Sequence, residues 1–290
     1  MSLERKSACK VNFVLNILGR RADGFHELET LFFPVPLYDQ LSAKRIAAGI
    51  ELTCSNPQLA CDASNLVWRA AQAFLDTAGI SDGVGLHLTK NLPIAAGLGA
   101  GSANAATTLL LLNELFGFPL LPAALDSLAA SLGSDVNFFL QSGPATATGR
   151  GERINPLPPF GLLRGCALLL FRPGFGVATP WAFKRLAGFP DRLNGRAGLV
   201  DRAVEAFSGA DLRTAAGHLF NSLETPVLSK YPILGVYQDS LRAAGAIGTL
   251  MSGSGSTTFA LFPELRQAES ASERFRGQFG PEGWLAVVSL

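Results

Sequence analysis

The stretch Pro93-Ile-Ala-Ala-Gly97-Leu-Gly-Ala-Gly101-Ser-Ala-Asn104 brings three glycines, Gly97, Gly99 and Gly101, directly before an apolar run that extends to Phe116. Glycine lets the backbone approach a ligand closely. A helix that begins at such a loop adds unpaired N–H groups and a partial positive charge. We therefore interpret the stretch as a phosphate-binding loop followed by a helix over about residues 103–116, whose small first residues leave room for a nucleotide.

The two common phosphate-loop motifs do not fit this stretch. A Walker A loop ends in Gly-Lys-Ser or Gly-Lys-Thr, whereas Gly101 is followed directly by Ser102. A Rossmann fingerprint needs a third glycine where this chain has Asn104. The pattern therefore leaves a less common phosphate loop, with a flexible connector as the alternative interpretation.

The composition excludes several classes of protein. The chain has 290 residues, enough for two domains, with 48% hydrophobic and 16% charged residues, so it is an ordered, apolar chain. Its 24 Lys and Arg balance 23 Asp and Glu, which argues against a nucleic-acid or membrane-surface partner. The cysteines form no metal-ligand spacing, so we expect reduced thiols in a cytoplasmic protein; they are Cys9, Cys54, Cys61 and Cys166.

Periodicity and turn residues predict a mixed chain of helices and strands. The proline-rich stretch 155–161 is the best candidate for a domain boundary, because closely spaced prolines fit neither a helix nor a central strand. The alternation in residues 11–17 predicts a strand with one face buried and the other available for function. A helix is expected over 65–78, with Ser64 or Asn65 as its N-cap and Gly79 as its end. The remaining expected elements are a helix over 125–132 and strands over 85–90, 167–171, 258–262 and 284–290.

Two further motifs give the glycine loop a family context. The chain has Ala8-Cys9-Lys10-Val11-Asn12 before the loop and Gly248-Thr-Leu-Met-Ser-Gly253-Ser-Gly255-Ser after it. In this order the three motifs resemble those of the GHMP kinases. The resemblance implies a two-domain α+β fold: an ATP-binding N-terminal domain over 1–158 with a left-handed βαβ unit, and a smaller α/β C-terminal domain over 159–290. The active site is then expected in the cleft between the domains.

Within that family the chain resembles one branch more closely. Lys10-Val-Asn12-Phe, Gly19-Arg-Arg-Ala-Asp-Gly24-Phe-His26 and Gly133-Ser-Asp135-Val are similar to motifs of the members that act on a CDP-linked methylerythritol. The resemblance implies phosphoryl transfer from ATP to its 2-hydroxyl, in the non-mevalonate route to isopentenyl diphosphate. Asp135 would take the hydroxyl proton and Lys10 would keep that carboxylate ionised. The residues alone also allow Asp135 as a helix N-cap and Lys10 as an exposed strand residue.

The resemblance also implies the contacts of the substrate. Phe25 and His26 would meet the cytosine, with a further aromatic, Phe183, from the second domain, and Asn12 would reach the diphosphate. An aromatic face and a hydrogen-bonding side chain suit a flat base with a polar edge. Taken singly, the phenylalanines are equally core residues and His26 a turn residue. The other implied substrate contacts are Phe32, Thr179, Gly253, Ser254 and Gly255.

The nucleotide contacts implied by the resemblance centre on the loop. Ser102 is a candidate to ligate Mg²⁺ or to bond a phosphate, and Mg²⁺ is expected with the nucleotide. No metal-binding carboxylate stands out, so we assign no metal site. Alanines replace glycine or serine of the family pattern at four loop positions. The implied ATP-binding residues are Asn65, Lys90, Pro93, Ile94, Ala95, Ala96, Gly97, Leu98, Gly99, Ala100, Gly101, Ser102, Ala103 and Asn104.

Two alternatives to this function are kept. One is another GHMP small-molecule kinase, of the homoserine or mevalonate type, against which the Phe25-His26 pair argues. The other is a non-catalytic nucleotide-binding paralogue, against which the presence of both Lys10 and Asp135 argues. In each case the expected partners are small molecules, with no nucleic acid and no membrane, and the chain is expected to be a monomer or a weak homodimer.

Overall fold

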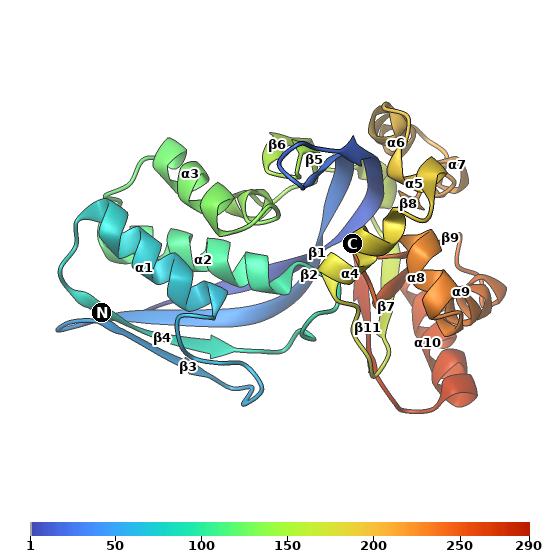
Figure 1. Ribbon diagram of the computed structural model, residues 1–290. Helices are drawn as coiled ribbons and strands as arrows, with labels where there is room; N and C mark the ends of the chain where they lie inside the picture. Colours follow the sequence, from blue (N-terminus) through green and yellow to red (C-terminus); the bar gives the residue numbers. More distant parts are fainter. Residues whose placement is uncertain (1) are drawn as a thin grey trace. The chain divides into compact units, whose positions relative to one another are not determined.

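The computed structural model describes residues 2–290, which form two compact units (Figure 1). The first unit contains residues 2–9, 37–92 and 99–142. The second contains residues 10–36, 93–98 and 143–290. Two long strands, β1 (Ser2–Arg20) and β2 (His26–Ile46), contribute to both units. The units are discontinuous in sequence, and a domain boundary at residue 158 stays a prediction.

The first unit contains a βαβ arrangement. Strands β3 (Ile50–Cys54) and β4 (Gly83–Thr89) pair in parallel and are connected through helix α1 (Leu66–Ala78). Strand β4 also pairs antiparallel with β2, from Gln40 opposite Thr89 to Ile46 opposite Gly83. The strand expected over 85–90 and the helix expected over 65–78 are therefore confirmed. The unit is completed by α2 (Ala100–Leu115), α3 (Pro122–Leu132) and a 3-10 helix, Asn137–Leu140.

Helix α1 begins and ends as its sequence predicts. The Asn65 side chain caps its N-terminus by accepting a hydrogen bond from the backbone N–H of Val67 at 2.9 Å. Gly79 ends it in the left-handed conformation, at φ +63°, which glycine adopts without a steric penalty.

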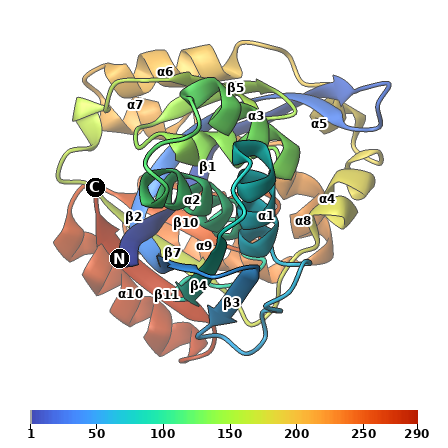
Figure 2. The same cartoon turned by 90° about the vertical axis from the view of Figure 1, so that its left-hand side faces the viewer.

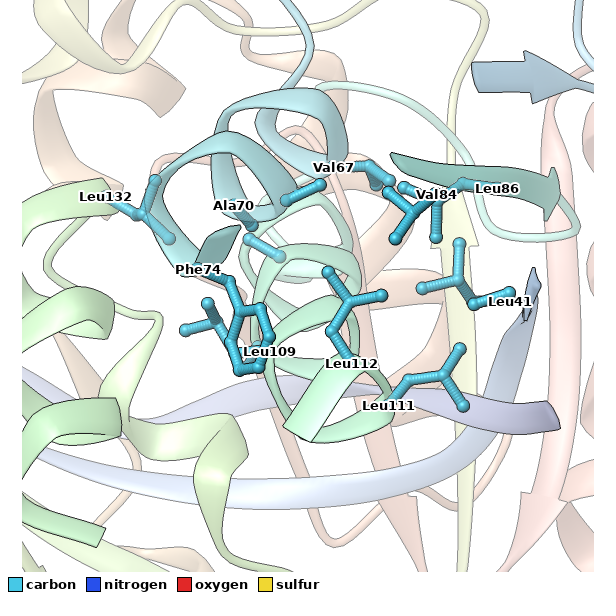
Figure 3. Close-up of a cluster of buried hydrophobic side chains, with 14 of the residues drawn as sticks. Leu41, Val67, Ala70, Phe74, Val84, Leu86, Leu109, Leu111, Leu112 and Leu132 are labelled. Carbon is cyan, nitrogen blue, oxygen red and sulfur yellow. The ribbon is translucent and has the colours of Figure 1, made fainter. Parts of the chain in front are cut away.

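Helix α2 begins earlier than the sequence suggests. It starts at Ala100 rather than at about residue 103, with Gly99 as its N-cap at φ +67°. Gly101 and Ser102 therefore lie inside the first turn, where the helix directs its unpaired N–H groups. Most residues of α2 are buried, on nearly all sides of the helix. Helix α1 lies beside it (Figures 1 and 2). Figure 3 shows Phe74 of α1 packed among Leu109 and Leu112 of α2 in the buried core of the unit.

The second unit is built around an antiparallel sheet. Its order is β11 (Trp284–Ser289), β7 (Ala167–Arg172), β10 (Thr258–Phe262) and β9 (Gly248–Met251), which confirms the three strands expected there. Helix α10 (Leu265–Phe279) packs on β7 and β11 (Figure 2). The further strands are β5 (Ala145–Gly149), paired with β2, β6 (Arg153–Pro156), paired with β5, and β8 (Phe220–Asn221), paired with β1. The further helices are a 3-10 helix (Gly161–Leu163), α4 (Thr179–Leu186), α5 (Pro190–Leu193), α6 (Leu199–Ser208), α7 (Leu212–Ala216), α8 (Glu224–Lys230) and α9 (Ile233–Ala243).

A buried carboxylate on β2 holds the start of α6. Glu29 Oε1 accepts hydrogen bonds from Asn16 Nδ2 at 2.9 Å and from the backbone N–H of Leu199 at 2.8 Å, and Oε2 accepts from that of Gly198 at 3.0 Å. A negative charge at a helix N-terminus is stabilising, because it meets unpaired N–H groups and the positive end of the helix dipole. Glu29 thus links β2 to a helix that is distant from it in sequence.

We expect Glu29→Gln to lower the free energy of unfolding by about 1–3 kcal/mol, because its NH2 group replaces one carboxylate oxygen and faces an N–H donor from which it cannot accept a hydrogen bond. Thermal denaturation measures this as a loss of about 2–4 °C for each kcal/mol. Glu27→Gln is the matched control, since Glu27 forms an exposed ion pair with Arg21 that contributes little. Equal thermal midpoints for the two variants would contradict the assignment.

Candidate active site

A chain of hydrogen bonds on the inner strands carries the side chains of Lys10 and Asn12. Lys10 Nζ donates to Asn12 Oδ1 at 2.6 Å, Asn12 Nδ2 donates to Thr30 Oγ1 at 2.8 Å, and Thr30 Oγ1 donates to the Val14 carbonyl at 2.5 Å. Lys10 is 3% exposed and Asn12 is 2% exposed. The alternative that Lys10 is an exposed strand residue is therefore wrong: its side chain is buried, and hydrogen bonding compensates the burial of the polar side chains.

Phe32 forms the apolar side of this arrangement. It lies on β2 almost completely buried, and the Lys10 ammonium lies 5.1 Å from the centre of its ring. An ammonium over an aromatic face is attracted by the negative charge of the ring face. Phe32 therefore helps to place Lys10, and its contact with a substrate stays a prediction.

The first half of the glycine loop is fixed to the Gly/Ser run, residues 252–256. The Ser252 hydroxyl donates to the Gly97 carbonyl at 2.9 Å, and the Thr257 N–H donates to the Ala96 carbonyl at 3.2 Å. The Leu98 carbonyl accepts from the Lys10 N–H at 3.0 Å. The structure therefore brings together, within the second unit, three motifs that are far apart in the sequence.

The Gly/Ser run has the backbone geometry that its glycines suggest. Gly253 and Gly255 have φ values of +56° and +83°. A Cβ on Gly253 would lie 3.0 Å from the Gly97 carbonyl oxygen and 3.6 Å from Asn12 Oδ1, so glycine permits the close approach. The predicted substrate residues Ser254 and Thr179 also meet, because their hydroxyl oxygens lie 2.8 Å apart.

The histidine and aromatic residue predicted to meet the base are brought together. The rings of His26 and Phe183 have centres 5.0 Å apart and an interplanar angle of 35°. Partial burial, and secondarily the positive charge of Arg20, lowers the pKa of His26 below its ordinary value. At neutral pH the imidazole is therefore neutral and carries one hydrogen-bond donor and one acceptor, which suits the polar edge of a base.

This lowered pKa predicts a pH dependence. A group whose pKa is lowered in the folded state favours its neutral form, so its contribution is present above the ordinary value of about 6.5 and is lost as the pH falls. We expect the KM for a cytidine-containing acceptor to be constant from pH 8 to about 6.5 and to rise at lower pH as His26 gains a proton. His26→Gln, assayed across the same range, should lack this rise in KM. If the variant shows the same rise as the wild type, the role of His26 is contradicted.

Phe25 stands at the end of a tight turn and is 50% exposed. The Arg21 N–H donates to the Phe25 carbonyl at 2.8 Å, and Gly24 has φ +87°. The guanidinium carbon of Arg150 lies 4.8 Å from the centre of the Phe25 ring. Half of the residue's surface is therefore exposed, and the guanidinium of Arg150 lies against the ring.

Asp135 lies in the first unit, in the turn that follows α3. The Val136 N–H donates to the Gly133 carbonyl at 3.2 Å. The next helical turn, Asn137–Leu140, has Val136 as its N-cap. The alternative that Asp135 is a helix N-cap is therefore wrong. Its carboxylate is half-buried, and its action as a base stays a prediction.

Three predicted nucleotide residues use their side chains in contacts within the first unit. Asn65 caps α1, and its Nδ2 donates to the Ala60 carbonyl at 2.7 Å. Lys90 forms a buried ion pair with Asp39. Asn104 Nδ2 donates to Asp39 Oδ2 at 3.0 Å. Ser102 lies half-buried in the first turn of α2, as its predicted contact with a phosphate or Mg²⁺ requires.

Comparisons with known proteins place the chain in a family. Residues 65–147 match the family model of the GHMP kinases N terminal domain, and residues 202–281 match that of the GHMP kinases C terminal. The 4-diphosphocytidyl-2-C-methyl-D-erythritol kinase of a Synechococcus strain is 40% identical over 277 residues, which cover 93% of this chain and 88% of that protein. The chain belongs to the 4-diphosphocytidyl-2-C-methyl-D-erythritol kinase family. The enzyme of the same name from Pelotomaculum thermopropionicum is 38% identical over 95% of this chain and 94% of its own length.

Solved structures agree with membership of this kinase family. A crystal structure of 4-(cytidine 5'-diphospho)-2C-methyl-D-erythritol kinase covers 99% of the chain and all of its own, with a TM-score of 0.81 and 35% identity. A homoserine kinase from Cytophaga hutchinsonii has a TM-score of 0.76 at 18% identity, which shows a shared fold alone. The expected α+β GHMP kinase fold is confirmed.

Sequence reasoning missed several residues that support this kinase site. Asn221 Nδ2 donates to the carbonyls of Met251 and Gly253 at 2.7 and 2.8 Å and so holds the Gly/Ser run. Arg150 lies against Phe25, and Asp39 contacts Lys90 and Asn104. A single polar residue gives no sign in the sequence of its distant partner. The one signal that the sequence offers is a polar residue on the apolar face of a strand, as at Asp39, because such a residue needs a buried partner.

The described residues 2–290 contain no group of three or more His, Cys, Asp or Glu side chains placed to hold a metal ion, and no helix in this range is long and apolar enough to cross a membrane. A magnesium ion that enters with a nucleotide keeps several waters and takes most other ligands from the phosphates. The Ser102 hydroxyl, at a helix N-terminus that favours phosphate, fits such an ion without a protein cage.

Proposed function

We propose that the protein transfers the γ-phosphoryl group of ATP to the 2-hydroxyl of 4-diphosphocytidyl-2-C-methyl-D-erythritol, giving the 2-phosphate and ADP. The observation that carries this proposal is the junction of Lys10, the glycine loop and the Gly/Ser run in the second unit. There the Lys10 N–H donates to the Leu98 carbonyl and the Ser252 hydroxyl to that of Gly97. A phosphate loop held against the strand of a buried lysine suits phosphoryl transfer, which needs positioning and charge stabilisation.

The residues divide the work between binding and chemistry. The loop amides and the N-terminus of α2 hold the phosphates of ATP, and a magnesium ion brought by the nucleotide supplies further neutralisation of phosphate charge. Lys10, held by Asn12 at 2.6 Å, stabilises charge at the transferring group. Asp135 accepts the proton of the acceptor hydroxyl. As it does so, the oxygen of that hydroxyl bonds to the γ-phosphorus, and the bond from the γ-phosphorus to ADP breaks.

The cytidine end of the acceptor is recognised by the second unit. His26 and Phe183 present a hydrogen-bonding ring and an aromatic ring with centres 5.0 Å apart, and Phe25 exposes half of its surface. These groups match a base that has flat faces and a polar edge. A homoserine or mevalonate acceptor would leave them unused, so binding energy favours the cytidine-linked acceptor.

An acceptor assay tests this function. Purified protein with Mg²⁺ and ATP should release ADP when 4-diphosphocytidyl-2-C-methyl-D-erythritol is added, at a kcat/KM at least about 1,000-fold above that with homoserine or mevalonate. Phosphorus NMR of the product should show one new phosphomonoester. Comparable turnover of homoserine or mevalonate would overturn the substrate, and absence of turnover with all three would overturn the kinase assignment.

The proposal includes the compartment and the oligomeric state of the enzyme. The described cysteines are free thiols, which is the usual state of cysteine in the cytoplasm, and we place the enzyme there as a monomer or weak homodimer. Sedimentation at micromolar concentration checks the oligomeric state.

A further inference from the structure

The carboxylate of Asp39, on β2, lies buried in the first unit with both oxygens hydrogen-bonded. The residue is 0% exposed. Its Oδ1 accepts from the backbone N–H groups of Asn91 and Leu92, each at 2.8 Å, and its Oδ2 accepts from Asn104 Nδ2 at 3.0 Å and pairs with the Lys90 ammonium. Burial of a carboxylate is costly unless it is paired and hydrogen-bonded, and these four donors compensate that cost.

These donors stand on the two flanks of the predicted phosphate loop. Asn91 and Leu92 directly precede Pro93, where the loop begins, and Asn104 lies near the start of α2, where the loop ends. The pairing of Gln40 with Thr89 places Asp39 beside the end of β4. One carboxylate therefore holds both the point where the chain leaves β4 and the point where it enters α2.

The side chains of Lys90 and Asn104 face this carboxylate. The Lys90 side chain is 4% exposed, and Asn104 is 2% exposed. Asn104 Nδ2 also donates to Ser7 Oγ at 3.0 Å, so both of its amide hydrogens are used within the first unit. Both residues, which the family resemblance assigns to ATP, are thus placed to support the loop from inside the protein.

We propose that Asp39 is a positioning residue for the nucleotide, and that Lys90 and Asn104 act on ATP through Asp39 rather than by direct contact. The inference rests on the proposed function, because it takes the loop between Asp39's partners as the site of the ATP phosphates. A glycine-rich loop loses conformational entropy when it orders around a ligand. Fixing both ends in advance reduces that loss and lowers the Kd and KM for ATP.

The test compares three variants. They separate the loss of the ion pair between Asp39 and Lys90 from the loss of the hydrogen bonds that Asp39 accepts at the two ends of the loop. Lys90→Met removes the ammonium and leaves the other three donors on Asp39. Asp39→Asn with Lys90→Met keeps an oxygen for the two backbone N–H groups. Asp39→Leu with Lys90→Met removes every acceptor, and because neither double variant buries an unpaired charge, both are expected to fold.

We expect the KM for ATP to change by less than about threefold in Lys90→Met. In Asp39→Leu with Lys90→Met it should rise at least about tenfold, because the hydrogen bonds that hold both ends of the loop are lost. Asp39→Asn with Lys90→Met should fall between them. The KM for the acceptor should stay within about twofold throughout. Glu29→Gln controls for general destabilisation, because it removes a buried carboxylate from the second unit and should leave the KM for ATP unchanged.

Calorimetric binding of Mg-ATP without acceptor separates this inference from the proposed function. If the wild type binds ATP but phosphorylates no acceptor, the function fails, and the order of Kd values among the variants still decides the role of Asp39. A rise in Kd as large in Lys90→Met as in the double variants would overturn the inference, because Lys90 would then act directly. Equal rises in the KM values for ATP and acceptor, or a wild type that binds no ATP, would overturn it as well.

Discussion

Replacing Asp135 with asparagine is expected to lower kcat by about 100- to 10,000-fold, because the amide keeps the size of the side chain but cannot accept the proton of the acceptor hydroxyl. The KM for ATP should change by less than about threefold, since the residue is assigned to chemistry and not to nucleotide binding. Single-turnover kinetics with saturating ATP and acceptor measure this directly. The effect of Asp135→Asn is therefore expected on kcat and not on the KM for ATP.

Stability should not account for that loss. Asp135 is not the N-cap residue of the 3-10 helix that follows it, because Val136 holds that position. Asp62→Asn is a matched control in the same unit, where an exposed aspartate accepts hydrogen bonds from Ser64 in a turn. The control should retain wild-type kcat and a similar thermal midpoint. Activity in Asp135→Asn above about a third of wild type would show that a group other than Asp135 accepts the proton.

The sequence predicts the parts of the site that depend on local backbone geometry. Asn65 and Gly79 delimit α1 because a cap and a left-handed glycine act within one turn. Gly253 and Gly255 have the positive φ values that a Gly/Ser run suggests. The start of α2 at Ala100 escaped prediction, because the left-handed Gly99 caps the helix through its backbone and leaves no side-chain signature.

Contacts between distant segments are the part that the sequence does not reveal. The residues alone allow Lys10 as an exposed strand residue, yet Lys10 and Asn12 are both buried in a hydrogen-bonded chain that Thr30 completes. Asp39 sits in the pattern Leu37-Tyr-Asp-Gln-Leu41, where alternation places it on the same face as the two leucines but does not show what its carboxylate contacts. Its partners lie 51 or more residues away. Local periodicity carries no information on such partners, so their identification required the fold.

Replacing Gly97 with alanine is expected to lower kcat/KM for ATP by at least about a hundredfold, because a displacement of about 1 Å in a positioning element is enough for such a loss. Gly97 has φ +76°, and a Cβ there would lie 2.1 Å from the Ser252 carbonyl oxygen and 3.0 Å from the Gly255 nitrogen. Both contacts are with backbone, which cannot move aside as a side chain can. The loop and the Gly/Ser run must therefore separate, and the Ser252 hydrogen bond to Gly97 is lost with them.

Gly79→Ala distinguishes this clash from the strain of a left-handed alanine. Gly79 has φ +63°, and a Cβ there would meet no atom within 4 Å, so alanine adds strain alone, about 1–2 kcal/mol. It should lower the thermal midpoint and leave kcat/KM for ATP unchanged. Gly97→Ala should lower both the thermal midpoint and kcat/KM for ATP, and its kcat/KM should fall further than its kcat. If the two variants lose stability equally and Gly97→Ala keeps its affinity for ATP, the loop tolerates separation from the Gly/Ser run and its junction with Ser252 does not position the nucleotide.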